Sequence, residues 1–291
     1  MTIRPTPAGR FVDVPADAPA VKPEHAAALA GFEPVGFEAD GVVMRVWCAG
    51  RGPAVVVMPE IPGVTPPVLR FAREVGRAGF RVYVVELFGE PGARRTAGRI
   101  LRTLGHVCVS SAFSTLALGQ SSAITAWLRS LCRAAHVACG GPGVGAVGMC
   151  ITGNFALAMM VEPAVRAPVL SQPSTPFPLD AKRRRDLSVS DAELEVARRR
   201  VEVEGACVLG LRFSHDPACP PERFERLREV FGRGFEGVEI DSGPGNPHGC
   251  SRLAHSVLTE DLVDTAGHPT RAALDRVLAF FTERLAGGDA R

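Results

Sequence analysis

The chain has 291 residues, of which 46% are hydrophobic and 22% charged, which excludes a disordered or fibrous protein and leaves room for a sizeable buried core. Lysine and arginine total 33 against 31 for aspartate and glutamate, so the net charge of +2 gives no global attraction for nucleic acid or an anionic membrane. No apolar run approaches the roughly 20 residues that span a bilayer. We therefore expect a catalytic protein that binds neither nucleic acid nor membrane.

The chain contains eight cysteines, a number that would suggest disulfides in a small secreted domain. Most of them stand in apolar runs, as Cys48 and Cys207 do, where cysteine is usually a small buried hydrophobe. The first thirty residues lack a continuous apolar core behind a basic start, so they do not resemble a signal peptide. The sequence predicts reduced thiols and a cytoplasmic location.

Short apolar runs and amphipathic stretches alternate along most of the chain. The apolar runs, several of them rich in β-branched residues, indicate strands buried on both faces: Val42–Cys48, Ala54–Pro59, Arg81–Leu87, Gly145–Cys150, Ala167–Leu170, Ala206–Phe213 and Gly237–Ile240. The amphipathic stretches indicate helices: Pro66–Gly79, Gln120–Ala138, Gly153–Val161, Asp191–Val201, Pro220–Phe231 and Thr270–Leu285. This alternation predicts an α/β fold with a mostly parallel central sheet and helices on both faces.

Capping signals place some boundaries of these elements. Ser190 and Glu193 fit a capping box, so a helix should begin at about Asp191. Glycine and proline at 140–142 should end the preceding helix. The stretches 90–114 and 171–189 fit neither pattern and are candidate loops or a small cap over the sheet edge. Without a long linker, we expect an N-terminal extension over residues 1–40, packed on or near a single domain over residues 41–291.

The segment around Cys150 carries the strongest chemical signal. An apolar strand runs into Cys150, and an apolar helix leaves from Gly153, which leaves almost no residues for the turn. Small residues such as Gly148 and Gly153 are needed where strand and helix cross in a nucleophile elbow. The elbow would project the Cys150 side chain at the positive end of a helix, where a thiolate is stabilised.

This segment has two other interpretations. Gly143, Gly145 and Gly148 match a dinucleotide-binding spacing, but these glycines lie before or within the strand and no acidic residue follows at about 20 positions. We expect no cofactor. Cys150 could also be a buried core thiol without chemical function.

A nucleophile needs a base and an orienting acid, which follow it in the order acid, then histidine, in the elbow fold. Asp216 stands just past the predicted strand that ends at Phe213, where a carboxylate can accept a hydrogen bond from an imidazole. Its alternative role is that of a turn residue before proline. Both His248 and His255 lie in the loop after the strand that ends at Ile240, and their position does not separate them.

Four motifs together resemble the dienelactone hydrolase family of α/β-hydrolases over Val42 to Leu285. They are Gly148-x-Cys150-x-x-Gly153, Pro59-Glu60-Ile61-x-Gly63, Ser214-His215-Asp216-x-x-x-Pro220 and Ala254-His255-Ser256. The resemblance implies an α/β-hydrolase fold with Cys150 as nucleophile, His255 as base and Asp216 as orienting acid. It also implies that Glu60 holds the resting thiol and that the backbone N–H groups of Ile61 and Ile151 form the oxyanion hole. Glu60 could instead be a salt-bridged loop residue.

The chain departs from the family pattern at two positions. Thr152 stands where the family usually has a second glycine, which makes the elbow more crowded. Thr259 stands where an arginine that grips a substrate carboxylate is expected, and the second such arginine could be any of Arg94, Arg95, Arg99 and Arg102. The predicted substrate is therefore a small ester or lactone without a more specific identity.

Rival functions come from other classes. A thioesterase or acyltransferase could use the same triad, and a non-catalytic ligand-binding protein could use the same fold. A zinc site is a further alternative, since soft nitrogen and sulfur ligands lie on the predicted loops at His215, Cys219, His248, Cys250 and His255. Their spacings match no closed metal site, so we expect no metal.

Overall fold

A single mixed sheet organises the protein. The computed structural model describes residues 3–16, 18–109, 122–175 and 180–286. Within them the strands are β1 (Gly9–Val12), β2 (Glu33–Ala39), β3 (Val42–Gly50), β4 (Ala54–Met58), β5 (Arg81–Val85), β6 (Val144–Met149), β7 (Val165–Ser171), β8 (Val208–Phe213) and β9 (Phe235–Ile240). Their order across the sheet is β1-β2-β3-β5-β4-β6-β7-β8-β9. Neighbouring strands from β1 through β3 to β5 pair antiparallel. The remaining neighbours, from β5 through β4 and β6 to β9, pair in parallel.

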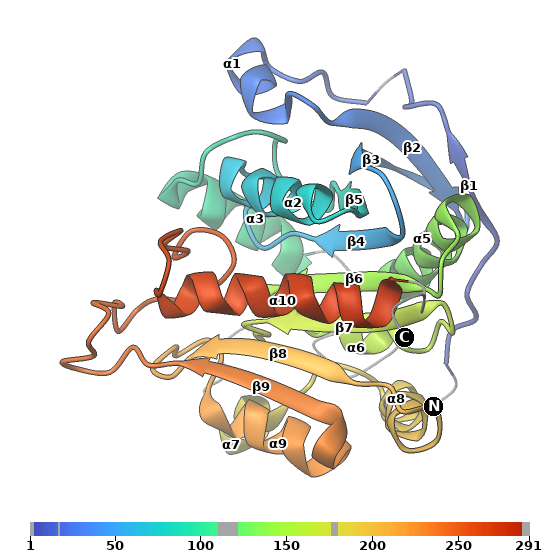
Figure 1. Ribbon diagram of the computed structural model, residues 1–291. Helices are drawn as coiled ribbons and strands as arrows, with labels where there is room; N and C mark the ends of the chain where they lie inside the picture. Colours follow the sequence, from blue (N-terminus) through green and yellow to red (C-terminus); the bar gives the residue numbers. More distant parts are fainter. Residues whose placement is uncertain (1–2, 17, 110–121, 176–179, 287–291) are drawn as a thin grey trace.

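Helices cover both faces of this sheet (Figure 1). The helices of the described residues are α1 (Pro23–Ala26), α2 (Pro66–Arg77), α3 (Ala97–Val109), α5 (Ala123–Cys139), α6 (Phe155–Met159), α7 (Ala181–Arg185), α8 (Asp191–Glu204), α9 (Pro221–Phe231) and α10 (Pro269–Leu285). Apolar side chains of α2 and α10 pack on one face, and those of α5, α6, α8 and α9 pack on the other. The sheet is therefore the middle of three layers.

The central strands are buried on both faces because both of these layers press on them. In β4, Val55 and Val57 face the α2–α10 layer, whereas Val56 and Met58 face the α5–α6 layer. All of these side chains are fully buried. This explains why the central strands are continuous apolar runs rather than alternating ones.

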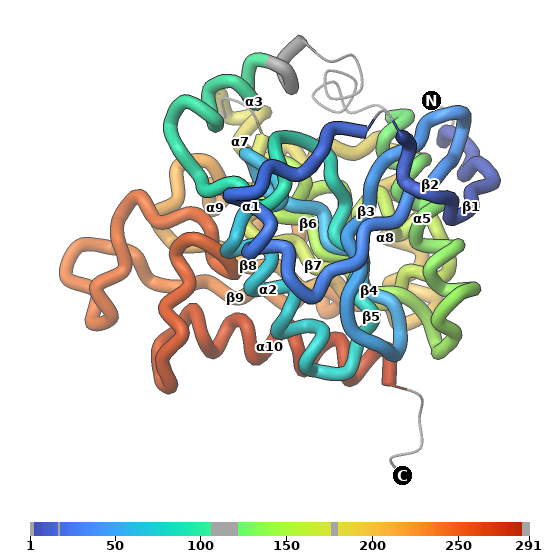
Figure 2. Tube along the Cα trace, turned by 90° about the horizontal axis from the view of Figure 1, so that it is seen from above, coloured from blue at the N-terminus to red at the C-terminus, as the bar shows by residue number. Residues whose placement is uncertain are grey.

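The parallel strands direct their carboxyl ends to one edge of the sheet. The chain leaves β4 toward Glu60, β6 toward Cys150 and β8 toward Asp216 at this edge. The loop 241–268, which carries His255, and helix α3 lie at the same end of the molecule in both views (Figures 1 and 2). Ligands of open α/β sheets bind at such an edge.

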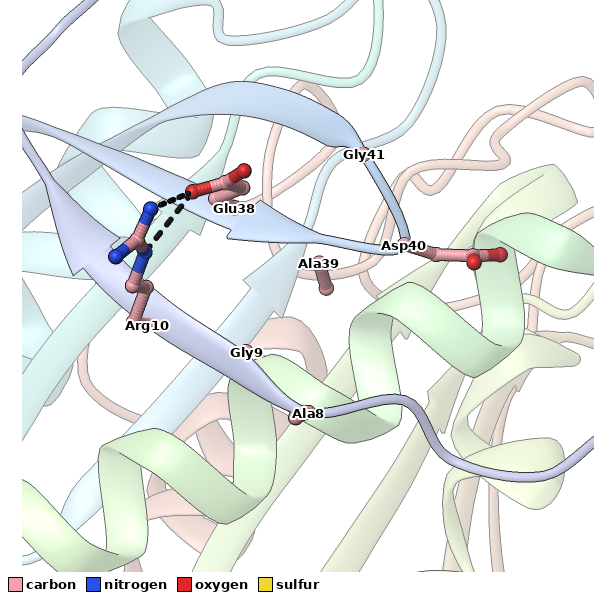
Figure 3. Close-up of a pocket in the computed structure, with 7 residues that line it drawn as sticks. All are labelled: Ala8, Gly9, Arg10, Glu38, Ala39, Asp40 and Gly41. Carbon is pink, nitrogen blue, oxygen red and sulfur yellow. Dashed lines mark hydrogen bonds and ion pairs between the residues drawn. The ribbon is translucent and has the colours of Figure 1, made fainter.

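The N-terminal strands form the opposite part of the sheet. In the register of β1 and β2, Arg10 stands opposite Glu38, and their side chains are joined by a hydrogen-bonded ion pair (Figure 3). A hollow of about 310 Å³ lies there, lined by residues 8–10 and 38–41. Figure 1 places this edge far from the loop 241–268, so the hollow does not belong to the edge that carries Cys150.

The structure confirms the predicted architecture and much of its punctuation. All predicted strands and helices are present within a few residues of their expected bounds. The capping box at Ser190 and Glu193 and the helix end at Gly140 are both formed. Helices α3 and α7 occupy parts of the two unassigned stretches. Strands β1 and β2, which were not expected, lie inside the predicted N-terminal extension. The boundary at residue 40 stays a prediction.

Candidate active site

Cys150 lies at a sharp turn between β6 and α6. It directly follows the last residue of β6, and its φ of +56° falls in the left-handed region that side chains other than glycine rarely adopt. A single 3-10 turn, Cys150–Thr152, connects it to the helix that begins at Phe155. This strained backbone has the geometry of a nucleophile elbow.

The two glycines around the turn are required by close backbone contacts. A Cβ atom on Gly148 would lie 1.9 Å from the carbonyl oxygen of Thr152. A Cβ atom on Gly153 would lie 2.6 Å from the Cα atom of Pro173 and 2.9 Å from the carbonyl oxygen of Cys150. Since real Cβ contacts are longer, any side chain at these positions would deform the elbow. The structure thus gives the steric reason for the glycines that the sequence pattern indicated.

Asp216 and His255 meet at the same edge of the sheet. Asp216 Oδ2 lies 2.6 Å from His255 Nδ1, a short distance typical of a charge-assisted hydrogen bond. Asp216 Oδ1 accepts a hydrogen bond from the backbone N–H of Ala218 at 2.9 Å, which fixes the carboxylate. The Asp216 side chain is 1% exposed and that of His255 18%. A buried acid therefore holds an imidazole that still reaches the surface.

The His255 imidazole also interacts with Cys150. Burial lowers the pKa of His255, but the negative charge of a Cys150 thiolate and the hydrogen bonds to Asp216 and Cys150 outweigh it. The net result is a pKa well above the ordinary value of 6.5. The structure thus brings Cys150, His255 and Asp216 together in that order, with the imidazole in the middle.

Asp261 fixes the backbone on either side of this histidine. Its Oδ2 atom accepts hydrogen bonds from the backbone N–H groups of His255 and Ser256, both at 2.9 Å. The Ser256 hydroxyl in turn donates to Glu60 Oε2 at 2.7 Å. The loop that carries His255 is therefore held from two sides by carboxylates. Sequence reasoning missed Asp261, because its contacts with the backbone of His255 and Ser256 follow from the loop conformation and have no local sequence signature.

Glu60 is buried among neutral hydrogen-bond donors. Besides Ser256, its carboxylate accepts from the hydroxyl of Thr259 and from Gln172 Nε2, the latter at 3.2 Å. Among the described residues, no hydrogen bond joins the Glu60 carboxylate to Cys150, and Glu60 forms no salt bridge. Thr259 uses its hydroxyl for this contact, and Gln172 was not among the expected site residues. Gln172 directly follows β7. Its place at the carboxyl edge of the sheet is the sequence feature that could have indicated a site residue.

Ile61 and Ile151 stand at the ends of neighbouring strands. Ile61 follows β4 by three residues, and Ile151 belongs to the turn after β6. The two strands pair in parallel up to Met58 and Gly148. Their backbone N–H groups thus belong to adjacent segments at the carboxyl edge. Their role as an oxyanion hole stays a prediction.

The remaining candidate residues lie in separate places. Among the described residues, no cluster of three or more histidines, cysteines or acids has a geometry that could hold a metal ion. His215 contacts Ser214, and the ring of His248 packs against that of His268 with centroids 5.7 Å apart.

Of the four arginines considered for a substrate carboxylate, Arg99 contacts Glu90. The pKa of Glu260 is raised by burial and by Glu60, and a positive charge at Arg95 opposes this rise.

Comparisons with known proteins identify the family of this chain. The model of the dienelactone hydrolase family matches residues 40–284. The chain belongs to the dienelactone hydrolase family. No match was found among curated proteins.

Solved structures with the family fold superpose on most of the chain. A protein from Klebsiella pneumoniae assigned to the dienelactone hydrolases is 18% identical, with 84% of this chain and 95% of that chain covered and a TM-score of 0.57. Dienelactone hydrolase from Anabaena variabilis is 15% identical, with 87% and 98% covered and a TM-score of 0.55. A dienelactone hydrolase-like promiscuous phosphotriesterase, P91 from metagenomic libraries, is 18% identical, with 87% and 98% covered and a TM-score of 0.54. The fold is thus that of the α/β-hydrolases, as expected from the motifs.

None of the described helices has both the length and the apolar composition needed to cross a membrane.

Proposed function

We propose that this member of the dienelactone hydrolase family hydrolyses a small carboxylic ester or lactone through a thioester formed on Cys150. The observation that carries the proposal is the series Cys150, His255 and Asp216, in which Asp216 lies 2.6 Å from the imidazole and Cys150 stands at a strained elbow. A nucleophile, a base and an orienting acid in this order are the parts of a catalytic triad. The cytoplasmic location stays a prediction.

The chemistry follows from the charges on these groups. The Cys150 thiolate attacks the carbonyl carbon, forming a C–S bond, and the C–O bond to the alcohol then breaks. His255, which is protonated in the ion pair, gives its proton to the departing alkoxide. A water molecule then attacks the thioester while His255 accepts one of its protons. The C–S bond breaks, the carboxylic acid leaves, and the thiolate–imidazolium pair is restored.

We further propose that the backbone N–H groups of Ile61 and Ile151 bind the oxyanion that forms in each step. Fixed donors of this kind stabilise charge where it develops, and losing one typically costs roughly 3–4 kcal/mol of barrier. Glu60 supports the site through its contacts with Ser256 and Thr259, which tie the end of β4 to the loop of His255. That Glu60 holds the resting thiol stays a prediction.

Intact-mass measurement after brief exposure to p-nitrophenyl acetate tests the function. We expect one acetyl group on Cys150, a burst of p-nitrophenolate, and no adduct in Cys150→Ala. Other thiols should react more slowly, because burial raises the pKa of both Cys48 and Cys219 to about 12. Faster modification of Cys219 or Cys250 in the folded protein would contradict the choice of nucleophile.

The histidines provide a matched pair for the same assay. His255→Ala should lower turnover by several orders of magnitude, because it removes the proton donor and acceptor of both steps. His248→Ala should have a mild effect, because the His248 ring packs against His268. Equal and severe losses in both variants would contradict the choice of base.

A further inference from the structure

Thr152 is the one residue of the elbow that the family pattern does not account for. Its side chain is fully buried, and its hydroxyl oxygen lies 2.9 Å from the backbone nitrogen of Met149 and 2.8 Å from the carbonyl oxygen of Met58. The carbonyl oxygens of Met149 and Pro59 lie 2.8 and 3.3 Å away. The hydroxyl therefore stands between the carboxyl ends of β4 and β6.

A hydroxyl can accept hydrogen bonds and donate one, and Thr152 uses both abilities here. It accepts from the N–H of Met149, and its proton has the carbonyl groups of Met58 and Met149 within reach. The β4–β6 ladder ends at the pair Met58 and Gly148. The side chain thus adds a polar link between the two strands at the point where their backbone pairing ends.

This link joins the two segments that carry the proposed oxyanion donors. Ile61 lies three residues after Met58, and Ile151 lies two residues after Met149. A small change in the separation of the strand ends would therefore change the distance between the two N–H groups. The value of such donors depends on placement, because they must meet the oxyanion at about 2.7–3.1 Å.

We propose that Thr152 is a positioning residue that sets the spacing of the Ile61 and Ile151 backbone N–H groups. The inference rests on the proposed function, in which these groups bind the oxyanion. It gives a functional reason for threonine where the family usually has glycine: the hydroxyl is an internal clamp between the strand ends.

Two reactions of the same thiol separate this role from a merely structural one. Acylation by p-nitrophenyl acetate develops charge on a carbonyl oxygen and needs the oxyanion donors. Alkylation by iodoacetamide forms an S–C bond to a CH₂ carbon and releases iodide, so no oxyanion arises. The experiment measures both rates for Cys150 in the full-length protein and in Thr152→Val, Thr152→Ser and Thr152→Gly.

In Thr152→Val we expect acylation to slow by about tenfold or more, up to the 10²- to 10³-fold cost of losing a donor. Alkylation should stay within about twofold, since valine keeps the shape of threonine but cannot form the hydrogen bonds. Thr152→Ser should restore acylation because it keeps the hydroxyl. If the valine variant does not fold, Thr152→Gly should show the same selective loss of acylation.

Three results would overturn the inference: a parallel loss of both reactions, no loss of either, or failure of serine to restore acylation. Failure of the proposed function is distinguishable, because it would appear in the unchanged protein as the absence of an acetyl adduct on Cys150. In that case the alkylation rates would report only on access to the thiol.

Discussion

At the scale of single residues, His255 has the environment that matters most for pH dependence. Burial lowers its pKa, but the charge of Cys150, followed by the hydrogen bond to Asp216, raises it well above the ordinary value of 6.5. The raised pKa favours the protonated imidazole, which can serve as the acid of the first step.

We predict that Cys150→Ala lowers the pKa of His255, because the substitution removes the charge of Cys150, which is the largest contribution that raises this pKa. In the unchanged protein the imidazole should stay protonated to a higher pH than in the variant. NMR titration of the His255 ring measures both values, and the His248 resonances serve as a control because that ring contacts His268. An unchanged or higher value in Cys150→Ala would show that Cys150 and His255 do not form a pair.

At the scale of elements, the sequence predicted those parts of the fold that rest on local patterns. Buried parallel strands and capped helices have signatures within a few residues, and the elbow has its glycines. The surroundings of Glu60 were not predictable in this way. Ser256 and Gln172 contact Glu60 from positions far away in the chain. The motif that contains Glu60 therefore could not show that its carboxylate is surrounded by neutral hydrogen-bond donors.

The elements that were missed lacked such local signals. Helix α7 is short and basic, and it is fixed by a cap at Asp180 and by ion pairs to α9, such as Arg184 with Glu222. Strand β1 has four residues, and its partner β2 begins at Glu33 in a stretch without a strong apolar run. Both depend on partners that only the tertiary structure brings together, so single-segment reasoning could not find them.

Arg223 on α9, a helix that the sequence did predict, shows how tertiary contacts support the candidate site. It is fully buried on α9 and donates hydrogen bonds to the carbonyl oxygens of Pro173 at 2.7 Å and Ala218 at 3.2 Å. Pro173 packs against Gly153 of the elbow, and Ala218 donates its N–H to Asp216. A single guanidinium therefore joins the loop beside the elbow to the loop of the acid.

We predict that Arg223→Met lowers the free energy of unfolding by about 3 kcal/mol or more, because several buried carbonyl groups lose a charged donor. Turnover of p-nitrophenyl acetate should fall as well, since the Asp216 loop loses a support. Denaturant unfolding and steady-state kinetics measure the two effects. Arg226→Met is the matched control on the same helix: its exposed pair with Glu229 should contribute at most about 1 kcal/mol. Similar effects of both substitutions would contradict the role of Arg223.

At the scale of the whole molecule, the N-terminal strands and the candidate site occupy different parts of the sheet. The candidate site lies at the carboxyl edge, whereas β1 closes the other part of the sheet (Figure 1). Phe11 of β1 packs against Phe37 and Tyr83, with ring centroids 5.2 and 5.6 Å away. The N-terminal segment also supplies the carbonyl oxygen of Arg4 to the buried Arg129, at 2.7 Å. It therefore covers part of the core without reaching Cys150.

We predict that deleting residues 1–13 lowers the free energy of unfolding by up to about 6 kcal/mol, because the partly buried ring of Phe11 contributes at most about 3 kcal/mol and the hydrogen bond to a charged group about 1.5–3 kcal/mol. Acylation of Cys150 by p-nitrophenyl acetate should persist at temperatures where the shortened protein is folded, because the candidate site is remote. Thermal unfolding and the burst amplitude measure the two properties. Phe11→Ala in the full chain should account for much of the loss. Arg10→Ala is the matched control, since its exposed pair with Glu38 should contribute at most about 1 kcal/mol. Loss of the burst in a folded, shortened protein would show that the N-terminal strands shape the active site as well as the core.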